Sequence, residues 1–183
     1  MRISPYNHGP GALLMDYQKL IRTRRSIRGY RPDPIPEDVL GRVLDAARIA
    51  PTAANRQPFQ LIVVTEAATR ARLKEVYDRE WFWAAPAVIV GCAEEAKAWQ
   101  RADGFNAAEV DLSIVMDHLI LAATDEGLGT CWICHFDEAR LKQILGIPGN
   151  VRVIALTPLG YPAAEPRPFQ RKPLEELVRR EHW

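Results

Sequence analysis

The sequence predicts one layered domain of the α/β class, in which helices cover a central sheet. Four short runs rich in β-branched residues have the length and composition of strands, and patterns with helical spacing separate them. No internal repeat or low-complexity segment interrupts the 183 residues, so a single domain accounts for the length. We expect residues 15–183 to form this domain with an extended C-terminal tail, and residues 1–14 to be a flexible extension.

Composition argues against several classes of protein. The formal net charge is only +1, whereas a nucleic-acid-binding protein normally carries an extended basic face. No apolar run approaches the roughly twenty residues that a membrane span needs, and the first fourteen residues lack the pattern of a secretory signal. Three cysteines cannot make a full disulfide framework. We therefore expect a cytoplasmic protein with neither nucleic acid nor membrane as a partner.

Local patterns define the elements of the first third. Residues 16–25 place apolar side chains at helical spacing and carry arginines at their C-terminal end. Prolines force an extended connector after them. A second helix over residues 36–50 begins with a proline and has acidic residues in its first turn. Residues 51–58, PTAANRQP, form a loop, and residues 59–65 form a strand by their β-branched content.

The middle of the chain alternates charged and apolar segments. Residues 66–78 are predicted to form a charged amphipathic helix, and the aromatic run over residues 80–85 follows it. The apolar run over residues 86–93 is too short for a membrane span and is typical of a strand buried on both faces. Residues 97–105 have aromatic side chains without periodicity, so we expect a surface linker there and the site of a mobile lid.

The longest helical pattern covers residues 106–126 and ends at a pair of glycines. It has two apolar faces: Val110, Ile114, Val115, Leu119 and Ala122 on one, and Leu112, Met116, Ile120 and Ala123 on the other. A helix that is apolar around most of its circumference must be surrounded. In a domain of this size we expect such a helix to lie at a subunit interface.

The last third contains two more strands, over residues 130–136 and 151–159, with a short helix between them that Asp137 is expected to cap. Four prolines keep the tail over residues 160–183 extended before a final charged turn. An extended tail has few local contacts, so we expect this one to lie along a neighbouring subunit.

A cluster of arginines is the most unusual local feature. Residues 21–30, IRTRRSIRGY, place four arginines around the hydroxyl of Ser26. Guanidinium groups bind phosphate bidentately, and a hydroxyl adds a donor to the same oxygens. The alternative is a solvated basic patch at a helix end. Because the chain as a whole is nearly neutral, the cluster favours a small anionic ligand over a nucleic acid.

The sequence CWICH contains Cys131, Cys134 and His135 in the spacing of c-type haem attachment and of thiol redox proteins. Alternation along the predicted strand places the two cysteines on opposite faces, which argues against both uses. Buried structural cysteines are the simpler interpretation. Neither a metal site nor a nucleophile triad has the necessary residues at a recognisable spacing.

Four segments in this order resemble the FMN-dependent nitroreductase family: RRSIRGY, APTAANRQPFQLIVV, GLGTCWI and PLGYPAAEPRPFQRKPLEELV. The resemblance covers residues 15–180. It implies an α+β (α/β layered) fold with a central mixed sheet flanked by helices, in an intertwined homodimer that binds two FMN molecules at its interface. The long helix would form the core of the dimer, and the tail would embrace the partner.

The resemblance also implies the cofactor site. Arg24 and Ser26 would meet the phosphate and ribityl chain of FMN, Arg28 would reach the pyrimidine side of the flavin, and Arg25 and Arg171 would add phosphate ligands. The loop residues laid against the flavin by the other subunit would be Pro51, Thr52, Ala53, Asn55 and Gln57. Backbone groups of Trp132, Ile133 and Cys134 would line the ring.

One residue of the family pattern is missing. Several family members have a lysine before the second strand, near the N1–C2 edge of the flavin, whereas this chain reads YDREWFWAAP there. Arg28 is then the cation expected at that edge.

The activity implied is transfer of hydride from NADH or NADPH, through N5 of the flavin, to a nitroaromatic, quinone or similar acceptor by a ping-pong mechanism. No side chain is expected to be catalytic, because the cofactor carries the chemistry. Three alternatives stay open: the same fold used for dehalogenation or flavin destruction, a c-type haem electron carrier, and a non-enzymatic module that binds phosphate or nucleic acid.

Overall fold

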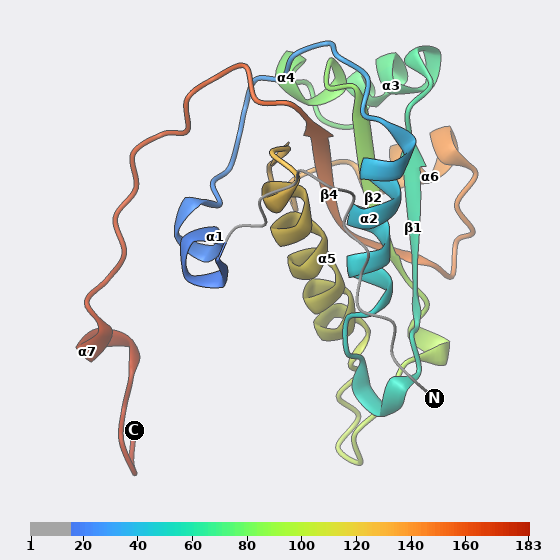
Figure 1. The fold of residues 1–183 in the computed structure, drawn as a ribbon. Coiled ribbons are helices and arrows are strands. Elements are labelled where there is room, and N and C mark those ends of the chain that lie inside the picture. The colour runs from blue at the N-terminus through green and yellow to red at the C-terminus, as the bar shows by residue number, and fades with distance from the viewer. Residues whose placement is uncertain (1–15) are drawn as a thin grey trace, which may run out of the picture.

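The computed structural model describes residues 16–183 and has a four-stranded sheet between two layers of helices (Figure 1). The extension expected over residues 1–14 lies outside the described residues. Among residues 16–183, no helix combines the length and apolarity that crossing a membrane requires.

The sheet has the strand order β1-β2-β4-β3, and all of these neighbours are antiparallel. Its strands are β1 (Phe59–Val64), β2 (Ala87–Ala93), β3 (Gly129–Thr130) and β4 (Arg152–Gly160). Every residue of β2 is buried, as its uninterrupted apolar run predicted. A mixed sheet was expected. Among the described residues, the parallel pairing is limited to an isolated bridge between Ser26 and Thr130.

Two long helices cover one face of the sheet. These are α2 (Glu37–Arg48) and α5 (Ala108–Asp125), which pack against each other and against strand residues such as Ile89. Gly91 lets α5 approach closely, because a Cβ there would lie 3.2 Å from side-chain atoms of Leu112 and of Met116.

Shorter helices cover the opposite face. They are α3 (Ala67–Arg72), a 3-10 turn (Leu73–Glu75), α4 (Glu80–Trp83) and α6 (Glu138–Leu145). They pack on Val88 and Val90, which point away from Ile89 because side chains alternate along a strand. The Asp137 carboxylate accepts a hydrogen bond from the amide of Arg140 at 2.9 Å, which confirms the predicted cap of α6.

Helix α5 buries mainly one of its two apolar faces within the chain. Its buried apolar residues are Ala108, Leu112, Val115, Met116, Leu119, Ile120 and Ala123. Val110 lies on the other apolar face and is 47% exposed in the single chain, so its expected burial at a subunit interface stays a prediction. Val110 and Ile114 line an open hollow on the outer side of the helix together with His118.

The strand predicted over residues 130–136 is much shorter. β3 ends at Thr130, and the only later pairing among the described residues is an isolated bridge between Ile133 and Leu156. Two neighbours on β4 account for the break. Pro158 has no amide hydrogen to offer the ladder, and the amide of Cys131 donates instead to the Thr157 hydroxyl at 3.1 Å.

Two other predicted segments also differ. The helix expected over residues 66–78 is divided between α3 and the 3-10 turn that follows it. The linker expected over residues 97–105 is a closed turn, because Arg101 donates its amide to the Phe105 carbonyl at 2.9 Å and Gln100 pairs with Asn106. Its mobility as a lid stays a prediction.

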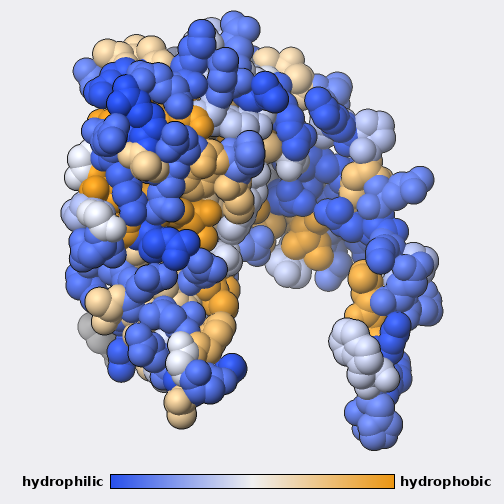
Figure 2. All heavy atoms as spheres, turned by 180° about the vertical axis from the view of Figure 1, so that it is seen from behind, coloured by the Kyte–Doolittle hydropathy of each residue, from blue (hydrophilic) through white to orange (hydrophobic). Residues whose placement is uncertain are grey.

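Helix α1 (Tyr17–Thr23) and the C-terminal tail have few contacts with the rest of the chain. The tail leaves the end of β4 and descends on the outer side of α1, where it forms the short helix α7 (Leu174–Leu177) (Figure 1). Figure 2 shows it as an arm that projects beside the body of the molecule. Neither α1 nor α7 contains a buried residue, and the side chain of Leu174 is 70% exposed.

Candidate cofactor site

The arginine segment is held in an extended conformation between β3 and the start of the tail. The amide of Ile27 donates to the Thr130 carbonyl at 2.8 Å. Two residues later, the Gly29 carbonyl accepts a hydrogen bond from the amide of Ala163 at 2.9 Å. Residues 24–31 therefore join two segments that are far apart in the sequence, and their side chains have defined directions.

Two glycines make these close crossings possible. A Cβ at Gly29 would lie 2.8 Å from the Cβ of Ala164, and a Cβ at Gly129 would lie 2.8 Å from the Cγ1 of Ile27. Both distances are shorter than van der Waals contact permits. Glycine is thus required where the arginine segment meets the tail and where it meets β3.

Five guanidinium groups converge in one cavity of about 210 Å³. The residues that line it are Arg24, Arg25, Ser26, Arg28, Arg167, Pro168, Phe169 and Arg171. No carboxylate is among them, and none of the five arginines forms an ion pair with any part of the chain that the structure describes. Cations gathered in this way repel one another unless an anion joins them.

The ring of Phe169 links the two halves of the arginine set. The Cζ of Arg25 lies 3.5 Å from the ring centroid, and the Cζ of Arg171 lies 4.7 Å from it. These distances are typical of cation–π contacts. The tail is therefore attached to the arginine segment through the lining of the cavity itself.

Sequence reasoning missed three members of this cavity, the consecutive residues Arg167, Pro168 and Phe169. All three lie in the stretch EPRPFQR, where a second arginine occurs close to Arg171. That spacing was the available signal, but only the folded chain shows that the whole stretch faces Ser26 and its arginine neighbours. The residues predicted to bind the phosphate, the ribityl chain and the pyrimidine edge of the flavin do line this one cavity: Arg24, Arg25, Ser26, Arg28 and Arg171.

Tyr30 closes the arginine segment. Its hydroxyl donates a hydrogen bond to the Ile27 carbonyl at 2.7 Å. Burial raises the pKa of Tyr30 well above its ordinary value, the nearby Cys131 thiol acts in the same direction, and Arg28 opposes them. The phenol therefore stays protonated and remains a donor.

Cys131 is buried next to the arginine segment, close enough to interact with Ser26, Arg24 and Arg28. Burial raises the pKa of this thiol, while the charges of Arg28 and Arg24 and a hydrogen bond with Ser26 oppose the rise. The thiol is only 3% exposed, so it serves as a packed, protonated side chain. Structural burial, the simpler of the interpretations for this cysteine, is confirmed.

Cys134 has a different environment from Cys131. It is exposed, and its sulfur accepts a hydrogen bond from the indole nitrogen of Trp132 at 2.9 Å. Attachment of a haem needs both thiols and the histidine at one accessible surface. Because Cys131 is buried, the structure contradicts the haem interpretation of CWICH.

The loop predicted to contact the flavin does not reach the arginine cavity of its own chain. Residues 51–57 follow α2 and are absent from the lining of that cavity. Within this loop, Ala54, Asn55 and Gln57 have φ angles of 52°, 53° and 50°. L-residues other than asparagine and aspartate rarely adopt this left-handed region. Within one chain, the arginine cavity and the loop over residues 51–57 are thus separate, and the backbone of the loop is strained.

The residues predicted to line the ring lie next to the arginine segment. Ile133 is buried and pairs with Leu156, whereas Trp132 is half-buried and Cys134 is exposed. Their strand-like segment continues from Thr130, which pairs with Ser26. The backbone pairing of Thr130 with Ser26 therefore brings this segment close to the arginine segment.

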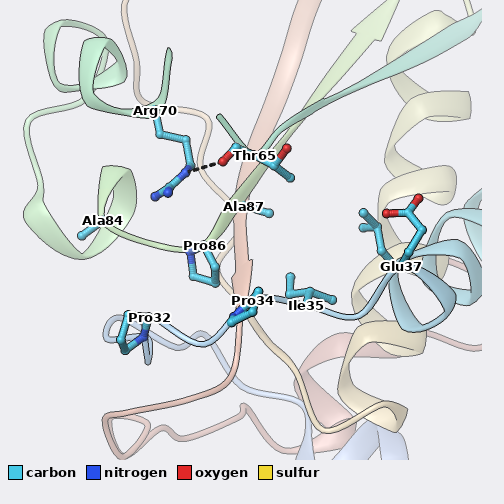
Figure 3. A pocket seen from close by; sticks show the side chains of 10 residues that line it. Pro32, Pro34, Ile35, Glu37, Thr65, Arg70, Ala84, Pro86 and Ala87 are labelled. Atoms are coloured by element: carbon cyan, nitrogen blue, oxygen red, sulfur yellow. Dashed lines mark hydrogen bonds between the residues drawn. The ribbon is translucent and has the colours of Figure 1, made fainter. Parts of the chain in front are cut away.

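A second cavity of about 360 Å³ lies where Pro32 and Pro34 face the start of β2 (Figure 3). Arg70 lines this cavity, and its guanidinium donates to the Thr65 carbonyl at 3.1 Å and to the Ala85 carbonyl at 2.6 Å. Because these donors serve backbone carbonyls, Arg70 has a structural role and ties α3 to the ends of two strands. Across residues 16–183, no cluster of three or more side chains is arranged to hold a metal ion.

Comparison with known proteins gives the same family by two routes. The Nitroreductase family model matches residues 21–78 and 74–161. The chain is 33% identical to an NADH dehydrogenase of Thermus thermophilus, over 90% of this chain and 96% of that protein. It is 34% identical to a putative NADH dehydrogenase/NAD(P)H nitroreductase of Archaeoglobus fulgidus, over 80% of this chain and 86% of that protein.

A solved structure supports the same assignment. The crystal structure of a nitroreductase family protein from Clostridium difficile 630 superposes with a TM-score of 0.86 at 34% identity, and covers 92% of this chain and 100% of that one. The antiparallel sheet, its helical layers and the arginine segment thus occur in a chain whose sequence and fold both match one family. This protein belongs to the nitroreductase family.

Proposed function

We propose that the protein is an FMN-dependent oxidoreductase that takes hydride from NADH or NADPH and delivers it to a nitroaromatic, quinone or similar acceptor. The observation that carries the proposal is the convergence of five guanidinium groups and the Ser26 hydroxyl in one cavity without a carboxylate. The names of relatives support the electron donor: NADH dehydrogenase in Thermus, and putative NADH dehydrogenase/NAD(P)H nitroreductase in Archaeoglobus and Methanothermobacter.

The cavity fits the phosphate of FMN. A phosphate monoester carries a charge near −2 at neutral pH and offers three acceptor oxygens. Arg24, Arg25 and Arg171 supply the planar donors that bind such oxygens bidentately, and Ser26 adds a hydroxyl. Arg167, from the tail, adds a further cation to the same cavity. Binding of the phosphate would relieve the repulsion among these groups.

The other predicted residues would surround the ring. Bound FMN supplies the hydride chemistry, and the protein supplies position and charge. Arg28 would place a cation at the pyrimidine edge, where the family's lysine is missing. The segment from Trp132 to Cys134 would line the ring on the same subunit. The loop of the other subunit would cover it with Pro51, Thr52, Ala53, Asn55 and Gln57.

We propose a homodimer because the site is divided within one chain. The loop over residues 51–57 is not part of the arginine cavity of its own chain. Apolar side chains of Tyr17, Ile21 and Val110 are also exposed on α1 and on the outer side of α5. Exposed apolar surface on two neighbouring helices is typical of an interface. A second chain seated there would bury it and bring a loop to the ring.

We place the protein in the cytoplasm because Cys92, Cys131 and Cys134 are all unpaired thiols.

A related activity on the same fold is the main alternative. Relatives at 25% and 26% identity are named iodotyrosine deiodinase 1, from Rattus norvegicus, and 5,6-dimethylbenzimidazole synthase, from Rhodospirillum rubrum. Both activities would use the same phosphate cavity, so the acceptor distinguishes them. Oxidation of NADH or NADPH that depends on an added quinone or nitroaromatic supports the proposal. Turnover only with an iodotyrosine, or breakdown of the flavin, supports the alternative.

The proposal is tested by cofactor binding to variants of two arginines in the same stretch. Arg24→Ala removes a cavity residue, whereas Arg22→Ala removes an exposed arginine that does not line the cavity. We expect the purified wild type to show flavin absorbance with about one FMN per chain, and Arg24→Ala to bind FMN at least ~10-fold more weakly, by loss of a charge-assisted hydrogen bond. Arg22→Ala should match the wild type.

A second arm uses riboflavin, which has the same ring without the phosphate. Titration of the apoprotein should show riboflavin binding at least ~100-fold more weakly than FMN, because phosphate contacts are then absent. Equal affinity for the two flavins, or equal FMN affinity of the two arginine variants, would contradict the assignment of the cavity.

A further inference from the structure

Asp111 is a buried carboxylate that the cofactor site described above does not use. It lies in the first turn of α5, and its side chain is 2% exposed. Its Oδ1 accepts a hydrogen bond from the amide of Ala53 at 2.8 Å. Its Oδ2 is buried and has no hydrogen-bond partner among the described residues. Burial of a carboxylate with one oxygen unsatisfied is unfavourable, so its retention needs a reason.

The partner of Asp111 belongs to the strained loop. Ala53 is followed directly by Ala54 and Asn55, both with φ angles in the left-handed region, and Gln57 shares that region. A Cβ makes this conformation costly for alanine and glutamine. Such backbone persists only where surrounding contacts determine it. The loop over residues 52–57 therefore needs anchors outside itself.

The loop is held by two side-chain hydrogen bonds to residues outside it and by further hydrogen bonds within it. Outside, Asp111 holds the Ala53 amide, and the Ala98 carbonyl accepts from the Arg56 guanidinium at 3.1 Å. Inside, the Thr52 hydroxyl accepts from the Gln57 amide at 3.0 Å. Arg56 is exposed, whereas Asp111 is buried and lies on a helix whose neighbouring Leu112 is wholly buried. Asp111 is thus the rigid anchor.

We infer that Asp111 is a positioning residue, which fixes the strained loop over residues 52–57 in the conformation that meets the flavin of the partner subunit. This inference rests on the proposed function. The buried helix α5 sets the position of the carboxylate, the carboxylate sets the position of Ala53, and the next residues follow with positive φ angles. Asp111 itself is not placed against the cofactor.

Variants of Asp111 separate the hydrogen bond from the charge. Asp111→Asn keeps a side-chain oxygen that can accept from the Ala53 amide, and Asp111→Ala removes it. Asp78→Ala is the control, since Asp78 is an exposed aspartate outside α5, the loop over residues 52–57 and the arginine cavity. We expect FMN to bind Asp111→Ala at least ~10-fold more weakly, because a buried hydrogen bond to a charged group is lost. Asp111→Asn should stay within about threefold of the wild type, and Asp78→Ala should not differ from it.

Relief of backbone strain gives the decisive readout. Glycine adopts positive φ without a steric penalty, so Ala54→Gly lets the loop keep its conformation with less help from Asp111. We expect the double variant Asp111→Ala/Ala54→Gly to recover at least threefold in FMN affinity over Asp111→Ala. A role confined to the stability of α5 would lower the melting temperature of Asp111→Ala without rescue by Ala54→Gly, and that result would overturn the inference.

Hydrogen exchange on the wild-type apoprotein tests the anchor without any variant or cofactor. The Ala53 amide should exchange more slowly than the Ala54 amide, because only the former donates to a buried carboxylate. Equal exchange of the two amides would overturn the inference even if Asp111→Ala failed to fold. A wild type that binds no FMN would instead refute the proposed function, while wild-type binding unchanged in Asp111→Ala would refute only the role of Asp111.

Discussion

The guanidinium carbon of Arg25 lies 3.5 Å from the centre of the Phe169 ring, so the beginning and the end of the described chain meet in one contact. Arg171 approaches the same ring at 4.7 Å. The aromatic ring thus contacts two cations of the arginine cavity, which repel each other. The tail therefore completes the cavity, because Phe169 and Arg171 both belong to its lining.

Loss of that ring should release the tail. Two exposed cation–π contacts are together worth about 1–2 kcal/mol, so Phe169→Ala should speed tryptic cleavage after Arg171 by roughly 5- to 30-fold. The bond after Arg171 is informative because trypsin does not readily cleave before proline, and the neighbouring sites Arg167 and Lys172 are both followed by proline. The measurement is the rate of appearance of the truncated chain by mass spectrometry.

The matched control for the tail is Leu177→Ala. Leu177 is exposed on α7 and does not line the arginine cavity, so its removal should leave the cleavage rate after Arg171 unchanged. Equal rates for Phe169→Ala and the wild type would show that the ring does not hold the tail.

The crossing of the arginine segment and the tail should be sensitive to a single methyl group. A Cβ at Gly29 would lie 2.8 Å from the Cβ of Ala164, an atom attached directly to the backbone. Gly29→Ala should therefore lower the free energy of unfolding by about 1–3 kcal/mol, as overpacking generally does. The measurement is the midpoint of urea denaturation at constant m-value.

Gly41→Ala provides a control with the opposite sign. Gly41 lies inside α2, and a Cβ there would meet nothing within 4 Å. Alanine should raise the free energy of unfolding by about 0.5–1 kcal/mol, because glycine is a poor helix former. If both substitutions shifted the urea midpoint in the same direction, the close approach at Gly29 would not be the cause.

Stability should fall in alkaline solution partly because of Cys92. Burial raises the pKa of its thiol from 9.0 to about 11, the Lys142 charge opposes the rise and the Glu138 charge adds to it. Between these two values the folded protein holds a proton that the unfolded chain has released. The free energy of unfolding therefore decreases as pH rises from about 9 to about 11, with a slope of up to about 1.4 kcal/mol per pH unit from this group.

Cys92→Ala tests that slope. The variant loses some stability at every pH because it leaves a cavity in the core, so the comparison concerns slopes and not absolute values. Urea denaturation at a series of pH values from 8 to about 11 should show a shallower alkaline decline for Cys92→Ala. Parallel curves for the two proteins would mean that Cys92 titrates alike when folded and unfolded.

Local patterns were sufficient for most helices and strands. α2, β1, β2 and the Asp137 cap of α6 lie where periodicity, β-branched runs and a capping residue predicted them. Each depends on residues adjacent in the sequence, so no tertiary contact was needed to find it. The family was likewise apparent from four segments in order, and comparison confirmed it.

Predictions failed where a distant partner decided the outcome. β3 ends at Thr130 because Thr157 and Pro158 on another strand break the ladder. Val110 fits an apolar face of α5 but is 47% exposed against the described residues, and its burial at a subunit interface stays a prediction. Periodicity reports which residues share a face, and it cannot report what packs against that face.

The sequence by itself determined most of the helices and strands, the family and the arginine segment, because these depend on residue types at short spacing. Tertiary structure alone decided that Arg167 and Phe169 join that segment in one cavity, and that Asp111 holds the loop at Ala53. These contacts form between segments brought together by burial of the core. Their geometry follows from the packing of the whole chain, and no local pattern encodes it.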